Sequence, residues 1–261
     1  MWGVFKSIHE LPEKWRKLER GTGCVSNNNN DHIELSLGEV EDGYANSQID
    51  DHPNLRRSEF CCRPPLSLKI KARMKSGSES PKGTAGFGFW NDPFMMTDHK
   101  MPTLPKAVWF FWSSSHSAME LAQGVPGHGW KMAVMDAWRW PFLALIPTIP
   151  LSIPLMWIRQ ARERLWPVAQ KAMICEEKMC SVSLLDWHHY EIRWLKTEVH
   201  FLIDGKECLR TSSPKGPLGL VIWIDNQYMR TNPKAIFSHG LLKLKSSQSL
   251  EIDHFELSHS G

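Results

Sequence analysis

The sequence lacks the features that mark several common classes of protein. Its 31 Lys and Arg residues nearly balance its 28 Asp and Glu residues, which gives a formal net charge of +3. So small an excess does not indicate nucleic acid as a partner, because phosphate recognition depends on clustered basic residues. The six cysteines include an adjacent pair and a pair separated by four residues, and neither spacing suits a zinc site. We therefore predict no metal and no other cofactor.

Signals of secretion are also missing. The stretch 1–20 is charged and has no apolar core of the kind found in signal peptides. No Asn-x-Ser/Thr glycosylation acceptor occurs anywhere in the sequence. We therefore expect reduced, mostly buried thiols in a cytoplasmic protein, with membrane association left open by the segment described below.

Short alternating stretches separated by turns predict an all-β fold. Residues 65–75 (PLSLKIKARMK) alternate between apolar and basic side chains, which is typical of a strand with one buried face. Residues 106–115 are apolar on both faces and predict a central strand, and residues 189–209 predict a hairpin-like pair. A short helix is expected over residues 5–20 from a weak apolar stripe. Many short strands indicate a β-sandwich or jelly roll, which we expect to form one domain over residues 1–261.

One segment, residues 139–180, interrupts the strand pattern as an insertion. Its first part, 140–158, contains no charged residue and is long enough to span a bilayer, but four prolines would break a helix there. The predicted strands on both sides must also join one sandwich, which argues against a membrane span. Three interpretations stay open: a lid or wall over a ligand cleft, a peripheral membrane or oligomer contact, and a true span.

The stretch 187–205, WHHYEIRWLKTEVHFLIDG, resembles the W-H-x-Y-x-x-x-W…V-x-F-x-x-D-G pattern of laminarinase-like β-glucanases. These enzymes belong to the concanavalin A-like lectin/glucanase superfamily. Shorter pieces such as GFGFW (86–90) and LEIDHFELS (250–258) resemble other strands of that family in the same order. The resemblance covers about residues 30–258 without the insertion. It implies a concanavalin A-like jelly roll of two curved antiparallel sheets, with a ligand groove on the concave face.

The sequence lacks carboxyl groups at the positions where those glucanases have their catalytic ones. Retaining glycosidases need two carboxyl groups close together, and the family supplies them from one strand as E-x-D-x-x-E or E-x-D-x-E. The matching strand here is AVWFFWSSS (107–115), with Trp109 and Phe111 where carboxylates are expected. The stretch EIDHFE (251–256) has the required letters, but it lies in the closing strand. We therefore do not expect classical β-glucanase activity.

We expect the candidate site to consist of aromatic and short polar residues on the strands that form the predicted groove. Thirteen tryptophans are more than a core of this size needs, which suggests an aromatic-lined surface. The candidate catalytic acids are Asp92 and Asp225, since a carboxyl group held against indole rings loses hydration and its pKa rises. The candidate ligand-binding residues are Trp90, Asn91, Trp109, Phe111, Trp112, Asp136, Trp223, Asn226 and Tyr228. Trp112 belongs to the set only if the 106–115 strand has the opposite register.

The same residues also have purely structural interpretations. Each tryptophan could pack in the core, and an aspartate beside an asparagine could serve a turn. The glycines at 86 and 88 are expected to leave room for a flat ligand against the backbone.

Two functional hypotheses follow. In the first, the cleft binds a hydrophobic or amphiphilic small molecule under the insertion, as an isomerase, cyclase or hydratase assisted by an aspartic acid. In the alternative, the protein is a glycan-binding module or an atypical glycoside hydrolase, as the resemblance implies. A membrane-associated scaffold without a pocket is a third interpretation.

Overall fold

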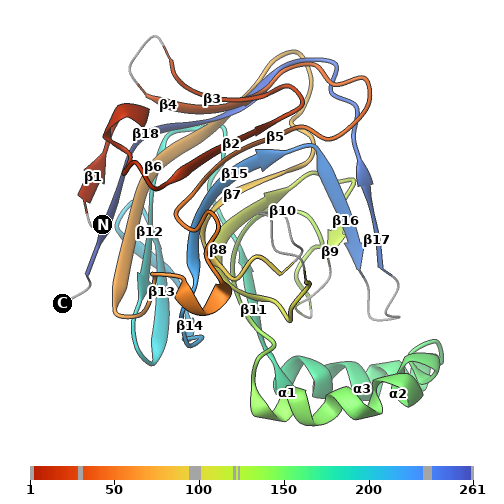
Figure 1. Ribbon diagram of the computed structural model, residues 1–261. Coiled ribbons are helices and arrows are strands. Elements are labelled where there is room, and N and C mark those ends of the chain that lie inside the picture. Colours follow the sequence, from red (N-terminus) through yellow and green to blue (C-terminus); the bar gives the residue numbers. More distant parts are fainter. Residues whose placement is uncertain are drawn as a thin grey trace.

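The computed structural model describes residues 3–28, 32–93, 101–119, 122, 124–231 and 237–259. Two large antiparallel sheets pack face to face as a jelly-roll sandwich (Figure 1), which confirms the fold class predicted from the sequence. The sheet that we call the outer sheet runs in the order β14 (Lys206–Ser212), β13 (Glu198–Ile203), β12 (His188–Trp194), β6 (Leu66–Ser76), β18 (Gln248–Ser258), β4 (Ile33–Leu37) and β3 (Gly23–Asn27), with β1 (Gly3–Phe5) beside β18.

The second sheet carries the candidate site, and we call it the cavity sheet. It runs in the order β11 (Ile174–Met179), β10 (Gly129–Asp136), β8 (Lys106–Ser113), β7 (Thr84–Trp90), β15 (Gly219–Asp225), β5 (Asn46–Asp50) and β2 (Arg16–Arg20). A small ribbon of β17 (Phe237–Leu241), β16 (Gln227–Thr231) and β9 (Ala118–Met119) stands beside this sheet (Figure 1). Short 3-10 turns, η1 (Ile8–Glu10) and η2 (Arg57–Glu59), lie in connections.

The core lies between the two sheets and follows the period-2 alternation of the strands. On β6, Leu68 and Ile70 are buried while Lys69 between them is exposed, as the sequence predicts. Phe87 and Phe110 face the core from the cavity sheet, and their rings lie 5.5 Å apart. Alternation works here because successive side chains of a strand point to opposite faces.

The prediction of a helix over residues 5–20 is wrong. The chain forms η1 and then the edge strand β2, which pairs with β5. Trp15 is buried against Phe5 and Phe255, with ring centroids 5.3 and 5.9 Å away. Aromatic packing of the N-terminal segment onto the sandwich therefore outweighs a weak helical stripe.

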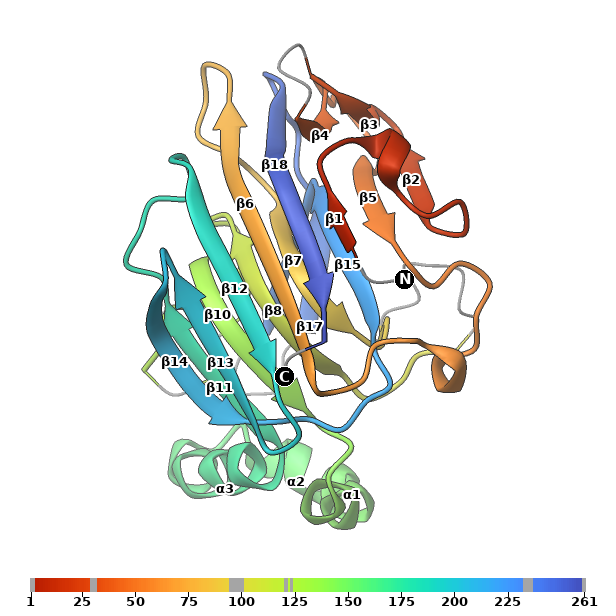
Figure 2. The same ribbon diagram turned by 90° about the vertical axis from the view of Figure 1, so that its left-hand side faces the viewer.

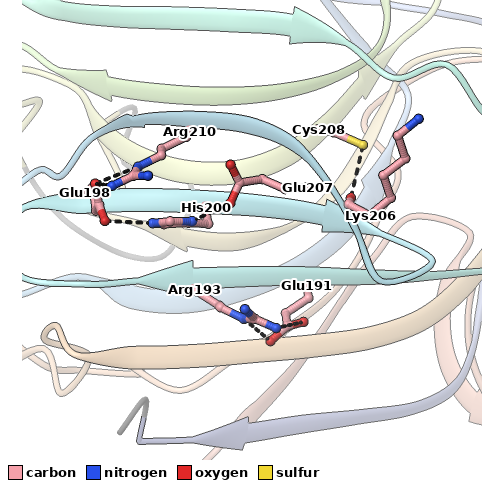
Figure 3. Close-up of polar contacts among 8 residues, drawn as sticks. All are labelled: Glu191, Arg193, Glu198, His200, Lys206, Glu207, Cys208 and Arg210. Carbon is pink, nitrogen blue, oxygen red and sulfur yellow. Dashed lines mark hydrogen bonds and ion pairs between the residues drawn. The ribbon is translucent and has the colours of Figure 1, made fainter.

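Ion pairs cover the solvent side of β12, β13 and β14 (Figure 3). The ring of His200 lies between two carboxylates, 2.9 Å from Glu198 and 2.6 Å from Glu207. Glu198 also binds Arg210 on the neighbouring strand, with oxygen and nitrogen 2.6 Å apart. These cross-strand contacts stabilise the register of the hairpin that the sequence predicts.

The insertion is helical and lies beyond one end of both sheets (Figure 2). It consists of α1 (Trp140–Leu145), η3 (Ile146–Thr148), α2 (Ile149–Leu155) and α3 (Arg159–Ala172), and it leads from β10 into β11. Within the described residues, no helix is both long and apolar enough to cross a bilayer.

Candidate functional site

A cavity of about 240 Å³ lies between the cavity sheet and the small ribbon of β9 and β16. Strands β7, β8 and β15 form its floor, and residues from β5, β10, β11 and the connection between β7 and β8 complete its wall. The lining consists of Gln48, Thr84, Trp90, Pro93, Pro105, Ala107, Trp109, Phe111, Met119, Met135, Glu177, Trp223, Asp225, Gln227, Tyr228 and Met229. Six of the predicted site residues are therefore brought together: Trp90, Trp109, Phe111, Trp223, Asp225 and Tyr228.

Four aromatic rings form the floor of the cavity. The indole of Trp223 lies 5.4 Å from that of Trp109 and 6.4 Å from that of Trp90, measured between ring centroids. The ring of Phe111 lies 5.4 Å from Trp109, so the cluster is continuous. Trp109 is half-buried while the other three rings are buried, which leaves Trp109 the most accessible ring for a ligand to stack on.

The glycines of β7 explain how so many rings fit on three adjacent strands. Gly86 lies opposite Phe111 on one side and Trp223 on the other. A Cβ atom at Gly86 would come within 2.7 Å of the Trp223 ring, and one at Gly88 would come within 2.7 Å of the Trp109 side chain. The Trp223 indole thus fills the space above Gly86, and the backbone of Val108 with the Cα and Cβ atoms of Trp109 fills that above Gly88. The expectation that this space admits a flat ligand against the backbone is wrong.

Asp225 is the buried carboxyl group of the cavity. Its Oδ1 atom accepts hydrogen bonds from Thr84 Oγ1 at 2.8 Å, from the Thr84 amide at 3.3 Å and from the Gln227 amide at 3.1 Å. Thr84 Oγ1 also accepts a hydrogen bond from Trp223 Nε1 at 3.0 Å, which fixes the indole beside the carboxyl group. Among the described residues none donates a hydrogen bond to Oδ2.

Burial raises the pKa of Asp225 from its ordinary value of 3.8 to about 7, and the hydrogen bonds from Thr84 and Gln227 only partly oppose this rise. A carboxyl group with such a pKa is present in both protonation states near neutral pH. It can accept hydrogen bonds when ionised or donate one when protonated.

Glu177 of β11 is a second carboxyl group in the lining, and sequence reasoning missed it. Burial raises its pKa, while the positive charge of Lys131 acts in the opposite direction. Lys131 is fully buried and its Nζ lies 3.4 Å from Glu177 Oε2. The stretch 174–179 (ICEEKM) does not alternate between polar and apolar residues, and no local signal connects it with Trp109, so its carboxylate could not be assigned to the site.

Two predicted residues at the end of β7 serve the loop instead of the cavity. The Asn91 side chain donates to Leu104 O and accepts from the Lys106 amide, both at 2.9 Å. Asp92 is buried and adopts left-handed backbone, with φ of 45°, and its carbonyl accepts a hydrogen bond from Arg57 at 2.7 Å. Asp92 lies in the loop after β7 and is not among the lining residues, so the cavity gives no support to the prediction of a catalytic acid at this position.

Three other predicted residues also lie outside the lining. Trp112 faces the opposite side of β8 and packs against the core, which fixes the register that brings Trp109 and Phe111 to the cavity. Asp136 ends β10, where it accepts a hydrogen bond from the Trp138 amide at 2.9 Å and lies 3.8 Å from Lys106 Nζ. Asn226 holds loops together through hydrogen bonds with Ala45 N, Gly43 O and Leu242 O.

The prediction that 140–158 roofs the cavity is wrong. Among the described side chains of that segment, none is in the lining, and its helices lie beyond the ends of the sheets (Figure 2). The side of the cavity opposite the sheet is formed by Met119, Tyr228 and Met229 instead. Within the described part of the chain, no group of three His, Cys, Asp or Glu side chains could hold a metal ion.

Comparisons with known proteins relate the chain to others only through its fold. No family model matches the sequence, and no similar curated protein was found. One similar structure is an endo-acting O-glycanase of the human gut microbiota that initiates mucin breakdown, with TM-score 0.53, 11% identity and 99% of each chain covered.

Two further structures show the same likeness. The Emp47p carbohydrate recognition domain has TM-score 0.51 and 10% identity, covering 100% of this chain and 95% of that one. A β-1,3-1,4-glucanase (lichenase) from a mouse hindgut metagenome has TM-score 0.51 and 10% identity, covering 98% and 99%. The structural neighbours are concanavalin A-like lectins and glucanases, as the sequence resemblance implies.

Proposed function

We propose that this protein binds a glycan, with one sugar ring seated in the cavity. The observation that carries the proposal is that Trp109 and Asp225 line the same cavity. The ring of Trp109 is half-buried and lies 5.4 Å from that of Trp223, and the Oδ2 atom of Asp225 accepts no hydrogen bond from the described residues. Aromatic rings offer the flat apolar surface that the C–H face of a sugar needs, and a carboxylate accepts hydrogen bonds from hydroxyl groups. Both kinds of contact occur within one small cavity.

The size of the cavity limits the ligand. A volume of about 240 Å³ lies below the range of roughly 300–1,000 Å³ that is usual for sites that bind drug-sized molecules. We therefore expect the cavity to hold one ring, such as the terminal residue of a glycan, with any remaining residues outside.

The solved structures with the same fold support a glycan as the ligand class. They include a mucin O-glycanase, a carbohydrate recognition domain, and the exoplasmic/lumenal domain of VIP36 in its Ca²⁺/Man3GlcNAc-bound form. Their identities of 9–11% relate them to this chain by fold alone, so the ligand class is part of the proposal.

The carboxyl groups favour binding over cleavage. The glucanase resemblance implies catalytic carboxylates on one strand, and the strand in that position, β8, presents Ala107, Trp109 and Phe111 to the cavity. The carboxyl groups of the lining, Asp225 and Glu177, come instead from β15 and β11, with β7, β8 and β10 between them. Hydrolysis by the family's single-strand arrangement is therefore not part of the proposal.

A second candidate function is binding of a hydrophobic or amphiphilic small molecule, with isomerisation or cyclisation assisted by Asp225. The apolar side chains of Met119, Met229, Pro93 and Pro105 around the aromatic floor favour it. A pKa of about 7 would allow Asp225 to donate a proton near neutral pH.

Binding to an immobilised panel of glycans, followed by calorimetry at several pH values, tests the proposal. We expect Trp109→Ala to abolish binding, while Trp187→Ala on the other sheet, beside Arg73, leaves it unchanged. Affinity for a glycan held by ionised Asp225 should rise as the pH increases through about 7. Absence of any glycan binding, together with a co-purifying apolar molecule found by native mass spectrometry and lost in Trp109→Ala, would establish the second candidate.

A further inference from the structure

The helical insertion exposes large apolar side chains to an unusual degree. The exposed fractions are 78% for Trp140, 77% for Leu151 and 64% for Trp157. Other exposed apolar residues of the same region are Trp138, Ile146, Leu155, Ile158 and Val168. Scattered surface apolar residues are normal, but such a concentration of exposed large apolar residues in one helical segment indicates a binding surface.

These side chains are not covered by the sandwich. No residue of α1 is buried, and α1 packs mainly against α3, which contacts the sandwich at β11. The insertion projects beyond the ends of the sheets (Figure 1 and Figure 2), and none of the described side chains of its helices lines the cavity. The apolar surface is therefore available to a partner outside this chain.

The charges around the surface have one predominant sign. Residues 140–158 carry no charge, Arg139 precedes them, and Arg159, Arg162 and Arg164 follow. Within residues 139–172, five basic residues and one acidic residue give a net charge of +4, whereas the whole chain has +3. The acidic residue, Glu163, is paired with Arg159 at 2.8 Å. The remainder of the protein thus carries a net charge of −1.

We propose that the surface formed by residues 138–168 docks in the plane of an anionic lipid membrane. Apolar side chains of a short helical segment enter the boundary between headgroups and acyl chains, and tryptophans are favoured at that depth. Basic residues beside them are attracted to anionic headgroups. Prolines divide the segment into short elements that lie on a membrane without crossing it. The basic flanks distinguish a lipid surface from a second copy of the chain, because two copies would bring like charges together.

Co-sedimentation with vesicles tests this inference. We expect wild-type protein to bind vesicles of phosphatidylcholine that contain roughly 30% phosphatidylserine, and to bind pure phosphatidylcholine vesicles more weakly. The variant Trp140→Ser/Leu151→Ser/Trp157→Ser should lose binding to both. The matched control Leu185→Ser removes a leucine that is 54% exposed on the sandwich and should bind as wild type.

A second variant separates the charge contribution. Arg159→Gln/Arg162→Gln/Arg164→Gln should weaken binding to the anionic vesicles by roughly fivefold per residue and leave binding to neutral vesicles unchanged. All substituted side chains of the apolar variant are exposed, so circular dichroism should show an unchanged fold. Failure of wild type to bind either vesicle, or equal binding by the apolar variant, would overturn the inference. A dimer in sedimentation that the apolar variant abolishes, without vesicle binding, would identify a second copy as the occupant and would also overturn it.

Discussion

Replacing Asp225 by Asn should change how stability depends on pH. The carboxyl group has a pKa near 3.8 in the unfolded chain, and burial raises the folded value to about 7. Between these values the folded protein keeps a proton that the unfolded chain has released. The stability that comes from protonated Asp225 is therefore complete below about pH 4 and is lost as the pH rises to about 7.

The size of the effect follows from the two pKa values. Each tenfold difference in proton affinity corresponds to about 1.4 kcal/mol, so ionisation of Asp225 should lower the free energy of unfolding by roughly 4 kcal/mol. An amide at this position has no charge to bury. Its Oδ1 atom can keep the hydrogen bonds from Thr84 and Gln227, so the variant should resemble wild type at pH 4.

Urea unfolding followed by tryptophan fluorescence measures this difference. We expect Asp225→Asn to be more stable than wild type at pH 8 by up to roughly 4 kcal/mol, and the advantage to disappear at pH 4. A difference between variant and wild type that does not change with pH would refute the assignment of a desolvated carboxyl group to the cavity.

Asp253→Asn is a control of opposite sign. A hydrogen bond from Lys71 lowers the pKa of Asp253 despite partial burial, so its contribution is present at neutral pH and is lost as the pH falls through the folded value. This variant should be less stable than wild type at pH 7, and the difference should disappear in acid.

Two more predictions concern the fold. Gly86→Ala should lower the free energy of unfolding by roughly 1–3 kcal/mol in the urea assay, because its Cβ would lie 2.3 Å from the Phe110 carbonyl oxygen. Gly38→Ala is the control and should be nearly neutral, since the nearest atom to its Cβ would be 3.4 Å away. Hydrogen bonds from His200, then from Arg210, lower the pKa of Glu198, so Glu198→Gln should lower the melting temperature at pH 7 but not at pH values below the folded pKa. Equal melting shifts at both pH values would contradict the second expectation.

The strands could be predicted from the sequence because their burial follows a local rule. Alternation in residues 66–76 and 188–203 reflects one face on the core and one in water, and the pairing of β12 with β13 follows from the short turn between them. The prediction of a short helix over 5–20 was wrong because Trp15 is stabilised more by packing against the rings of Phe5 and Phe255 than by helical contacts with its neighbours in sequence.

The lining residues that were predicted from the sequence lie mainly on the adjacent aromatic-rich strands β7, β8 and β15. Trp90, Trp109 and Trp223 lie on the adjacent strands β7, β8 and β15, so their alternation places them on one face. Gln48 and Glu177 reach the same cavity from strands whose neighbours are fixed by the chain topology. Asn and Asp residues misled the prediction, since Asp92 and Asn226 serve loops through the same hydrogen-bonding ability that would suit a ligand.

Strands β10 and β11 contribute residues to the lining of the cavity and also connect to the two ends of the helical insertion, which links the two proposals. Strand β10 carries Met135 of the lining and continues to Trp138 and α1, while α3 leads through β11 to Glu177. A membrane held by the insertion would therefore lie near the β10–β11 end of the cavity sheet, where a glycolipid could present its sugar to Trp109. Two weak contacts to one vesicle raise the apparent affinity together, because the second contact forms at high effective concentration. On vesicles that contain such a glycolipid, Trp109→Ala and the apolar insertion variant should each weaken binding by more than tenfold, a loss that corresponds to about 1.4 kcal/mol or more. If Trp109→Ala leaves binding to these vesicles unchanged although it abolishes binding to the free glycan, the two surfaces act on separate partners.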